Sequence, residues 1–430
     1  MKRIILYATA FSFLLAACGF SAGSPDSDGP VAPPSIPGSG GDSGYPGFGE
    51  SGGGEGNGNQ ERPSPGQLTG GEWSDIKNYG FYLNLFNIVD DPDNDPEIEE
   101  SQRRGGFGQF IDYFGFETRY MITVNVSGGA LPVGDAAVEL YAESQTMLFA
   151  AKTDVRGNAY LYPTYDLDGE NITVKVTSDG NESLHPFVYS RQELQITLDG
   201  HGAAQSVLDL MFVIDTTGSM GDELNYLKAE ISDVIGVISR NNPDYAINLA
   251  LLFYRDTDDE YVTRYFDFTR DIAAQQSNLS RQSANGGGDF PEAVDVALSE
   301  AVAKNWTAGN GENSATRLVF HVCDAPPHDT QGNKTLFFNS VRTAAEKGIR
   351  LIPVASSGID LATEYLLRQE ALMTGGTYIF LTDDSGIGES HLQPTVGEYT
   401  VEYLNACMVR VVNEYLTGIE RAPVPYTTSP

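Results

Sequence analysis

Hydrophobic and polar positions follow two different rhythms along this chain, and the rhythm changes near residue 200. Between residues 119 and 198, apolar residues alternate with polar ones in short runs such as RYMITVNV, AAVELYA and NITVKV, with turn residues between them. A period of two is typical of half-buried strands, and its regular interruption indicates a small antiparallel sandwich. We therefore expect an all-β, Ig-like domain over residues 119–200.

From residue 206 onward, continuous apolar runs alternate with segments of helical period. Strands are indicated by VLDLMFVID, NLALLFYRD, RLVFHVCDA, RLIPVASSG and TYIFLTD, and helices by MGDELNYLKAEISDVIGVIS, PEAVDVALSEAVAK and EYTVEYLNACMVRVVNEYL. Apolar strands that alternate with helices predict a mainly parallel sheet covered on both faces. The expected fold is a Rossmann-like, doubly wound α/β domain over residues 206–418, with ligands at the carboxyl ends of its strands.

The first 118 residues contain no such pattern. Two basic residues precede the apolar run IILYATAFSFLLAA, which is short for a membrane span and is placed as a secretory signal over residues 1–17. Residues 18–71 are rich in Gly, Ser, Pro and acid, and this composition predicts a disordered linker. Residues 72–118, with many aromatics and an acidic loop, are expected to dock on the later domains as helix or strand. Residues 419–430 are expected to be a flexible tail.

Charge and cysteine content narrow the possible functions. The chain has 26 basic and 59 acidic residues, a net charge of −33, which disfavours nucleic acid and anionic lipid surfaces and suits cations. Three cysteines and five histidines argue against a disulfide scaffold or a Cys/His zinc site. Cys323 and Cys407 either pair in an oxidising compartment or remain two buried free thiols, and the sequence leaves both open.

Oxygen side chains gather where three of the expected strands or loops end. Asp215, Thr217 and Ser219 alternate along FVIDTTGSM, Asp289 follows the glycines of GGGDFPE, and Asp324 ends the strand RLVFHVCD. Carboxylates at one edge of a sheet repel each other unless a cation lies between them. Oxygen ligands favour a hard divalent ion, Mg²⁺ or Ca²⁺ and also Mn²⁺. For the first loop, a simpler alternative is that Thr217 or Ser219 only caps the following helix.

The segment DTTGSM resembles the D-x-S/T-x-S motif of von Willebrand factor type A (VWA) domains, the metal-ion-dependent adhesion site (MIDAS), and the resemblance covers about residues 206–418. It implies that the five residues above form one metal site, with Mg²⁺ as the first expectation. Asp289 stands where the family usually has threonine, so metal preference is not transferable. The segments GGGDFPE and CDAPPH are similar to the hemicentin-like and α-kinase-associated branch. The resemblance also implies an open position on the ion for a carboxylate of a partner.

Two further resemblances concern the rest of the chain. The segment LAAC resembles a lipobox of bacterial lipoproteins, which implies cleavage before Cys18 and lipidation, including palmitate, of that cysteine. Gly19 then favours the outer over the inner membrane. The stretch ALPVGDAAVELYAESQTMLFAAKTDVRGNAYLYP resembles carboxypeptidase-regulatory modules, which are mostly structural spacers. Together they predict an exported protein held at the cell envelope by its lipid alone.

The expected function is capture of a protein partner, in adhesion or complex assembly, through a divalent cation and a carboxylate of that partner. The alternatives are a metal-stabilised structural scaffold and a metal-dependent hydrolase. No H-E-x-x-H or Walker A loop is present, G-x-S-x-G occurs only in the Gly/Ser-rich linker (GFSAG and GESGG), and the extra threonine of DTTGS breaks the register of an aspartic protease. His321 and His328 flank the third loop and could act as bases, but a satisfied core residue and a polar loop residue are the preferred interpretations. We therefore expect a binding protein rather than an enzyme.

Overall fold

The computed structural model describes residues 63–87, 106–199, 205–309 and 314–427. The expected signal, Cys18, the acidic loop near residue 95 and most of the expected linker lie outside these ranges. The described residues belong to one compact unit, Glu61–Pro430. None of the helices within them is both long and apolar enough to cross a membrane.

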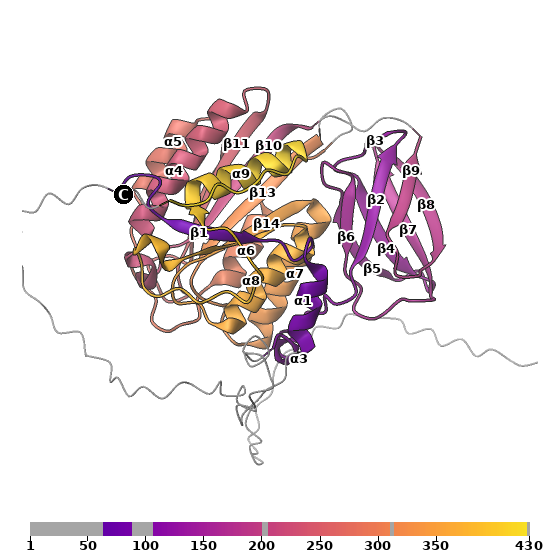
Figure 1. Ribbon diagram of the computed structural model, residues 1–430, viewed down its shortest axis with the longest axis horizontal. Helices are drawn as coiled ribbons and strands as arrows, with labels where there is room; N and C mark the ends of the chain where they lie inside the picture. The colour runs from indigo at the N-terminus through magenta and orange to yellow at the C-terminus, as the bar shows by residue number, and fades with distance from the viewer. Residues whose placement is uncertain (1–62, 88–105, 200–204, 310–313, 428–430) are drawn as a thin grey trace, which may run out of the picture. The chain divides into compact units, whose positions relative to one another are not determined.

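A mixed eight-stranded sheet forms the centre of this unit (Figure 1). Its strand order is β12-β11-β10-β13-β14-β15-β1-β16. The strands are β1 (Thr69–Trp73), β10 (Gln205–Asp215), β11 (Ala246–Tyr254), β12 (Thr263–Thr269), β13 (Ser314–Cys323), β14 (Ile349–Ala355), β15 (Tyr378–Leu381) and β16 (Glu402–Tyr403). Pairing is parallel from β11 through β10, β13 and β14 to β15, and antiparallel at both margins. The expected α/β class is confirmed, with a parallel centre.

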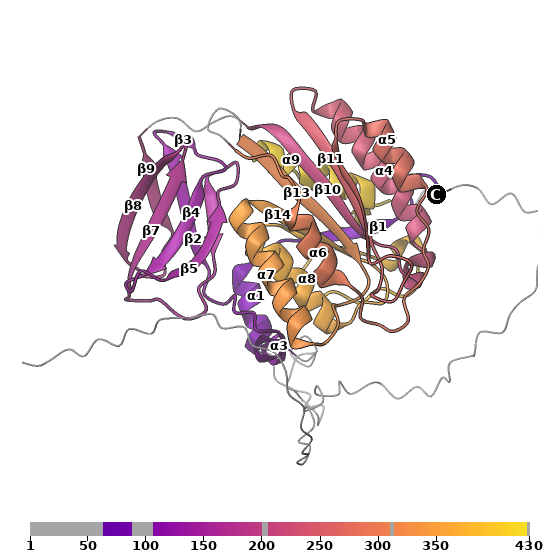
Figure 2. The same ribbon diagram turned by 180° about the vertical axis from the view of Figure 1, so that it is seen from behind.

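Helices cover both faces of the sheet (Figures 1 and 2). One face carries α4 (Leu224–Asn241), α5 (Ile272–Ser280) and α9 (Leu404–Thr417), and the other carries α6 (Val294–Ala303), α7 (Gln331–Lys347) and α8 (Leu361–Thr374). Along β10, Phe212 and Ile214 belong to the first layer, whereas Met211 and Val213 belong to the second. Burial on both sides explains why this strand is a continuous apolar run rather than an alternating one.

The segment before the β-rich region is part of the same sheet. Strand β1 lies between β15 and β16, with Gly70 opposite both Leu381 and Glu402. It leads into α1 (Tyr79–Asn84), the 3-10 helix η1 (Leu85–Asn87) and α3 (Gly108–Phe114). The linker boundary expected at residue 71 therefore lies inside a strand. The period-two signal could not reveal it, because β1 reads TGGEW and has one large apolar side chain.

Polar contacts hold this N-terminal segment against helices far away in the sequence. The buried Glu230 carboxylate of α4 accepts hydrogen bonds of 2.7 to 3.0 Å from the successive amides of residues 66–68. The fully buried Arg368 of α8 donates from Nε to Asp75 at 2.8 Å. Paired buried charges of this kind cost several kcal/mol when one partner is removed, so they fix the path of the segment.

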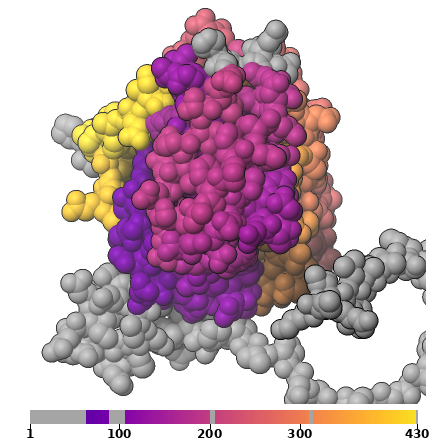
Figure 3. Space-filling view, turned by 90° about the vertical axis from the view of Figure 1, so that its right-hand side faces the viewer, coloured from indigo at the N-terminus to yellow at the C-terminus, as the bar shows by residue number. Residues whose placement is uncertain are grey.

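Residues 122–198 form a β-module inserted between α3 and β10. One of its sheets contains β2 (Ile122–Gly128), β3 (Leu131–Pro132), β6 (Asn158–Leu161) and β9 (Leu194–Leu198). The other contains β4 (Ala137–Ala142), β5 (Met147–Lys152), β7 (Asn171–Ser178) and β8 (Asn181–Val188). Alternate residues of β2 and β7 are buried, as the period-two pattern predicts. The module faces the viewer in Figure 3.

A buried ion pair joins the β-module to the sheet. Asp135 accepts two hydrogen bonds from Arg317 of β13, at 2.8 and 3.0 Å, and one from Lys152 at 2.9 Å. Because Arg317 is only 3% exposed, water does not solvate its positive charge, and the Asp135 carboxylate compensates it instead. The two arginine bonds are bidentate, which fixes orientation as well as position.

The two cysteines within the described residues, Cys323 and Cys407, are both free and buried. Cys323 belongs to one core layer and Cys407 to the other, so the sheet separates them. Of the two alternatives that the sequence left open, the structure has two buried free thiols.

A candidate metal centre at the carboxyl edge of the sheet

Two neighbouring parallel strands, β10 and β13, end side by side in the middle of the sheet. Strand β10 ends at Asp215, and Asp324 follows the last residue of β13; the register pairs Ile214 with Val322. The chain continues from β10 to β11 on one side, and later returns to form β13 on the other side of β10, so the strand order reverses there. Ligands of open α/β sheets bind at such a switch point, and the loops after β10 and β13 form its walls.

The first loop brings three oxygen groups together. Asp215 is fully buried, and its Oδ1 accepts hydrogen bonds from the Thr217 amide at 2.8 Å and the Thr217 hydroxyl at 2.6 Å. The Thr217 hydroxyl lies 3.1 Å from Ser219 Oγ. Thr217 precedes the 3-10 helix η2 (Gly218–Gly221) but makes no side-chain cap, so capping does not account for this loop.

The second loop runs around GGGDFPE (residues 286–292), and the third runs around CDAPPH (residues 323–328). Backbone hydrogen bonds hold both of them against the first loop. The Gly218 amide donates to Gly286 O at 2.9 Å, and the Asn285 amide donates to Thr216 O at 3.0 Å, which joins the first loop to the second. The Glu292 amide donates to Pro326 O at 2.9 Å, which joins the second loop to the third. The three loops are therefore one connected structure.

A cleft of about 190 Å³ opens between these loops, and Ser219, Asp289, Glu292 and Asp324 all contribute to its lining. Asp289 lies at its rim with an exposed side chain, whereas Asp324 is 4% exposed and Glu292 2% exposed. The sequence analysis overlooked Glu292. The only available signal was its position in GGGDFPE, three residues after Asp289, and spacing does not show which of two acids points inward.

Three buried carboxylate oxygens, one from each loop, have no hydrogen-bond partner: Asp215 Oδ2, Glu292 Oε2 and Asp324 Oδ1. Burial raises the pKa of Asp215 to about 6. Burial and the neighbouring Asp215 raise the pKa of Asp324 to about 8 and that of Glu292 to about 9. Buried polar groups are nearly always satisfied in native proteins, so three orphaned carboxylate oxygens on adjoining loops indicate a site suited to a positive group.

The donor set fits a hard divalent cation. Among the residues that the structure describes, no three His, Cys, Asp or Glu side chains converge closely enough to hold a metal by themselves. The hydroxyls of Thr217 and Ser219 lie in the same loop as Asp215, however, and would be the further neutral oxygen ligands of such an ion. Two carboxylates, two hydroxyls and water are the kind of set that Mg²⁺ accepts, because this ion keeps several of its waters.

Three histidines have buried acidic partners around the site. His321 Nδ1 lies 2.9 Å from Glu370 Oε2, and its Nε2 lies 3.3 Å from the Tyr254 hydroxyl, so it is a satisfied core residue. His391 Nε2 lies 3.0 Å from Glu223 Oε1. The second flanking histidine of the third loop, His328, bonds to Asp256 Oδ1 at 2.6 Å.

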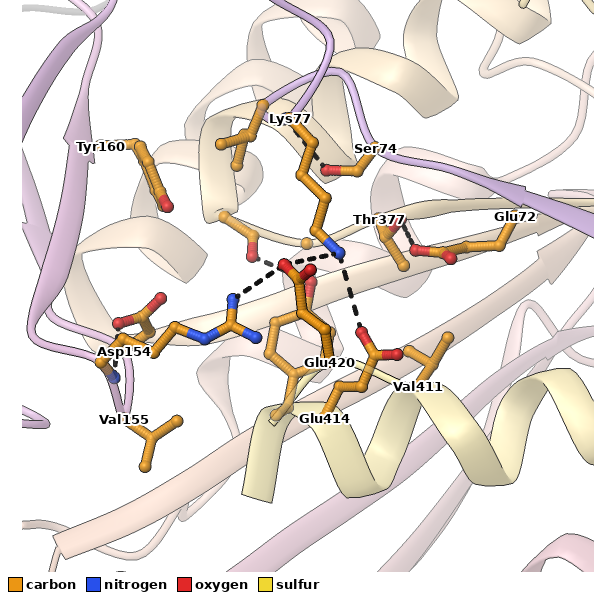
Figure 4. A pocket seen from close by; sticks show the side chains of 15 residues that line it. Glu72, Ser74, Lys77, Asp154, Val155, Tyr160, Thr377, Val411, Glu414 and Glu420 are labelled. Carbon is orange, nitrogen blue, oxygen red and sulfur yellow. Dashed lines mark hydrogen bonds and ion pairs between the residues drawn. The ribbon is translucent and has the colours of Figure 1, made fainter. Parts of the chain in front are cut away.

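A second cleft, of about 300 Å³, lies among β1, the β-module and α9 and differs in its electrostatics (Figure 4). Lys77 Nζ lies 3.2 Å from Glu420 and 3.8 Å from Glu414, and Arg156 lies 3.7 Å from Glu420. Its charges thus compensate one another, and none of its lining atoms is a buried orphan. This second cleft therefore shows no demand for a cation of the kind seen at the carboxyl edge.

Comparisons with known proteins identify the family of the domain that contains these loops. Residues 209–364 match the family model described as a von Willebrand factor A domain, so a domain of this family is present. An ariadne-like RING finger protein of Acanthamoeba polyphaga mimivirus is 31% identical over 235 residues, covering 50% of this chain and 22% of that protein. The alpha-protein kinase vwkA of Dictyostelium discoideum is 26% identical over 193 residues, covering 45% and 30%.

The chain thus spans less than a third of the length of either curated relative. Among solved structures, an aerotolerance-related membrane protein of Bacteroides fragilis matches with a TM-score of 0.33 and 12% identity, covering 48% of this chain and 98% of that one.

Proposed function

We propose that the VWA domain captures a protein partner through a divalent cation, Mg²⁺ first, held by Asp215, Thr217, Ser219 and Asp324, with Asp289 at the rim. The observation that carries this proposal is the set of orphaned carboxylate oxygens on three loops that backbone hydrogen bonds join around the cleft. When bound, the ion supplies an incompletely neutralised positive charge that attracts an anionic oxygen. The best occupant of that position is an Asp or Glu carboxylate of the partner.

The geometry favours binding over catalysis. His321 is fully buried and its ring nitrogens already face Glu370 and Tyr254, so it is not free to act as a base on a bound substrate. A cleft of about 190 Å³ has room for a side chain of a partner rather than for a large substrate. We therefore propose a role in adhesion or complex assembly.

The proposal extends to how the domain is held. The lipobox-like LAAC, followed by the linker, supports a lipoprotein attached to the envelope through Cys18, with the outer membrane favoured by Gly19. Incorporation of labelled palmitate that is lost in Cys18→Ser would support the anchor, and undiminished labelling would refute it.

Calorimetry of the full-length protein with Mg²⁺, Mn²⁺ and Ca²⁺ tests the central claim, with Asp215→Asn as the control. We expect saturable binding that the substitution abolishes, and a partner from the native envelope that is retained with Mg²⁺ and released by chelator. Ion binding that stabilises the fold without any chelator-sensitive partner would favour the scaffold alternative. Turnover of a phosphoester or peptide library that is lost in Asp215→Asn would favour the hydrolase. No binding of any of the three ions refutes the proposal.

A further inference from the structure

The second loop has two acids, Asp289 and Glu292. The proposed ion site explains why Glu292 is buried. Its side chain is 2% exposed, and its Oε2 has no hydrogen-bond donor. An unpaired carboxylate at this depth costs free energy unless a cation compensates it. Asp289, three residues earlier in the same loop, is exposed and can be hydrated without any cation.

Glycine packing shows how close Glu292 comes to the first loop. A β-carbon at Gly287 would lie 2.8 Å from Glu292 Oε1 and 3.3 Å from Thr217 Cβ. Gly287 also has a φ of +71°, a conformation that side chains rarely adopt. The glycine therefore lets the Glu292 carboxyl and the Thr217 side chain both approach the space that a β-carbon would fill.

The backbone of Glu292 is fixed as well. Its amide bonds to Pro326 O, and a β-bridge pairs Glu292 with Pro327, two and three residues beyond Asp324. The Glu292 backbone is thus bonded to the third loop, and its carboxyl lies near Thr217 of the first loop. Glu292 and Asp324 line the same cleft, and Glu292 interacts electrostatically with both Asp215 and Asp324, whose Oδ2 and Oδ1 atoms also lack hydrogen-bond partners.

We infer that Glu292 is a positioning residue of the ion site, which binds a water of the hydrated cation and compensates its charge from the second loop. Contact through water is consistent with the three acids being too far apart to hold a metal by themselves. Mg²⁺ keeps several of its waters in protein sites, and such outer groups commonly change metal affinity by about 10- to 100-fold. This inference rests on the proposed function. It assigns to Glu292 a part in setting the affinity of the site for Mg²⁺.

The test measures Mg²⁺ affinity and metal-free stability in one set of full-length variants. Glu292→Gln keeps the shape and removes the charge, and we expect it to weaken Mg²⁺ binding by about tenfold or more. Glu389→Gln is the matched control, because Glu389 lines the same cleft with an exposed side chain; its affinity should stay within about twofold of wild type. Asp215→Asn should abolish binding.

Stability without metal separates this role from a purely structural one. Oε2 makes no hydrogen bond that the amide could lose, so the unfolding temperature of Glu292→Gln in chelator should equal or exceed that of wild type. A lower unfolding temperature would assign Glu292 a packing role and overturn the inference. Wild-type affinity in Glu292→Gln, with binding lost in Asp215→Asn, would refute the inference alone. Absence of Mg²⁺ binding in wild type would refute the proposed function itself.

Discussion

Ion binding should release protons, because the ion-free site holds carboxyls whose pKa values are raised. Asp324 has a pKa of about 8 and Glu292 one of about 9, from burial and from the neighbouring acids. At neutral pH both groups are therefore protonated in the metal-free protein. A divalent cation favours their charged forms, so its binding displaces about one to two protons at pH 7.

Linkage between proton release and ion binding determines how steeply the Mg²⁺ affinity changes with pH. Each proton released makes the affinity rise about tenfold per pH unit, so release of one proton gives about a hundredfold increase between pH 6 and pH 8. Asp215, with a pKa of about 6, contributes at the acid end of this range. Calorimetry of Mg²⁺ binding at pH 7, in two buffers of different ionisation enthalpy, counts the protons directly. Equal heats in both buffers, together with equal affinities at pH 6 and pH 8, would refute the reasoning.

The same carboxyls set the pH dependence of stability without metal. Their folded pKa values lie above the ordinary values near 4, so the folded protein binds more protons than the unfolded chain between about pH 4 and pH 9. Their stabilising contribution is complete below the unfolded pKa and is lost as pH rises through the folded pKa. For each such proton, the free energy of unfolding of the metal-free protein falls by ~1.4 kcal/mol per pH unit, and Mg²⁺ should remove this slope.

Two predictions concern the framework of the site. Asp135→Asn leaves the 3%-exposed Arg317 without its anionic partner, and should lower the free energy of unfolding in urea by ~3 kcal/mol; an unchanged urea midpoint would show that the ion pair does not hold the β-module. Gly71→Ala places a methyl 2.6 Å from Phe380 Cζ and should cost about 1–3 kcal/mol, whereas Gly80→Ala, with no atom within 4 Å, should be neutral or stabilising. Equal thermal melts for the two alanine variants would contradict this packing.

The sequence was most informative where burial on both sides of the sheet leaves a continuous apolar run. FVID and HVCD predict two central strands that end in acids, and the structure has Asp215 and Asp324 at the ends of β10 and β13. Strand β1 left no such signal. Its two glycines pack against Phe380, which is far away along the chain, and local periodicity contains no information about such partners.

The acids of the second loop show a similar limit. Asp289 and Glu292 both follow the glycine run, and the sequence analysis chose Asp289 as the ligand because it directly follows the glycines. Only the fold shows that Glu292 is buried beside Thr217 while the Asp289 side chain is exposed. The Glu292 backbone is held by the bond from its amide to Pro326, which belongs to a different loop later in the chain. Whether Asp289 binds the ion stays a prediction.

The place of β1 in the sheet has a consequence for the order in which the molecule assembles. Thr69 Oγ1 donates to Thr382 O, 313 residues later, and β1 also pairs with β16. During synthesis, the N-terminal strand is made first, yet it has no partner until residues 378–403 have left the ribosome. Contacts of such sequence separation slow folding and leave unpaired edges exposed to other chains. The sheet can therefore close only after residues 378–403 have been synthesised, and the edges that β1 covers stay open until then.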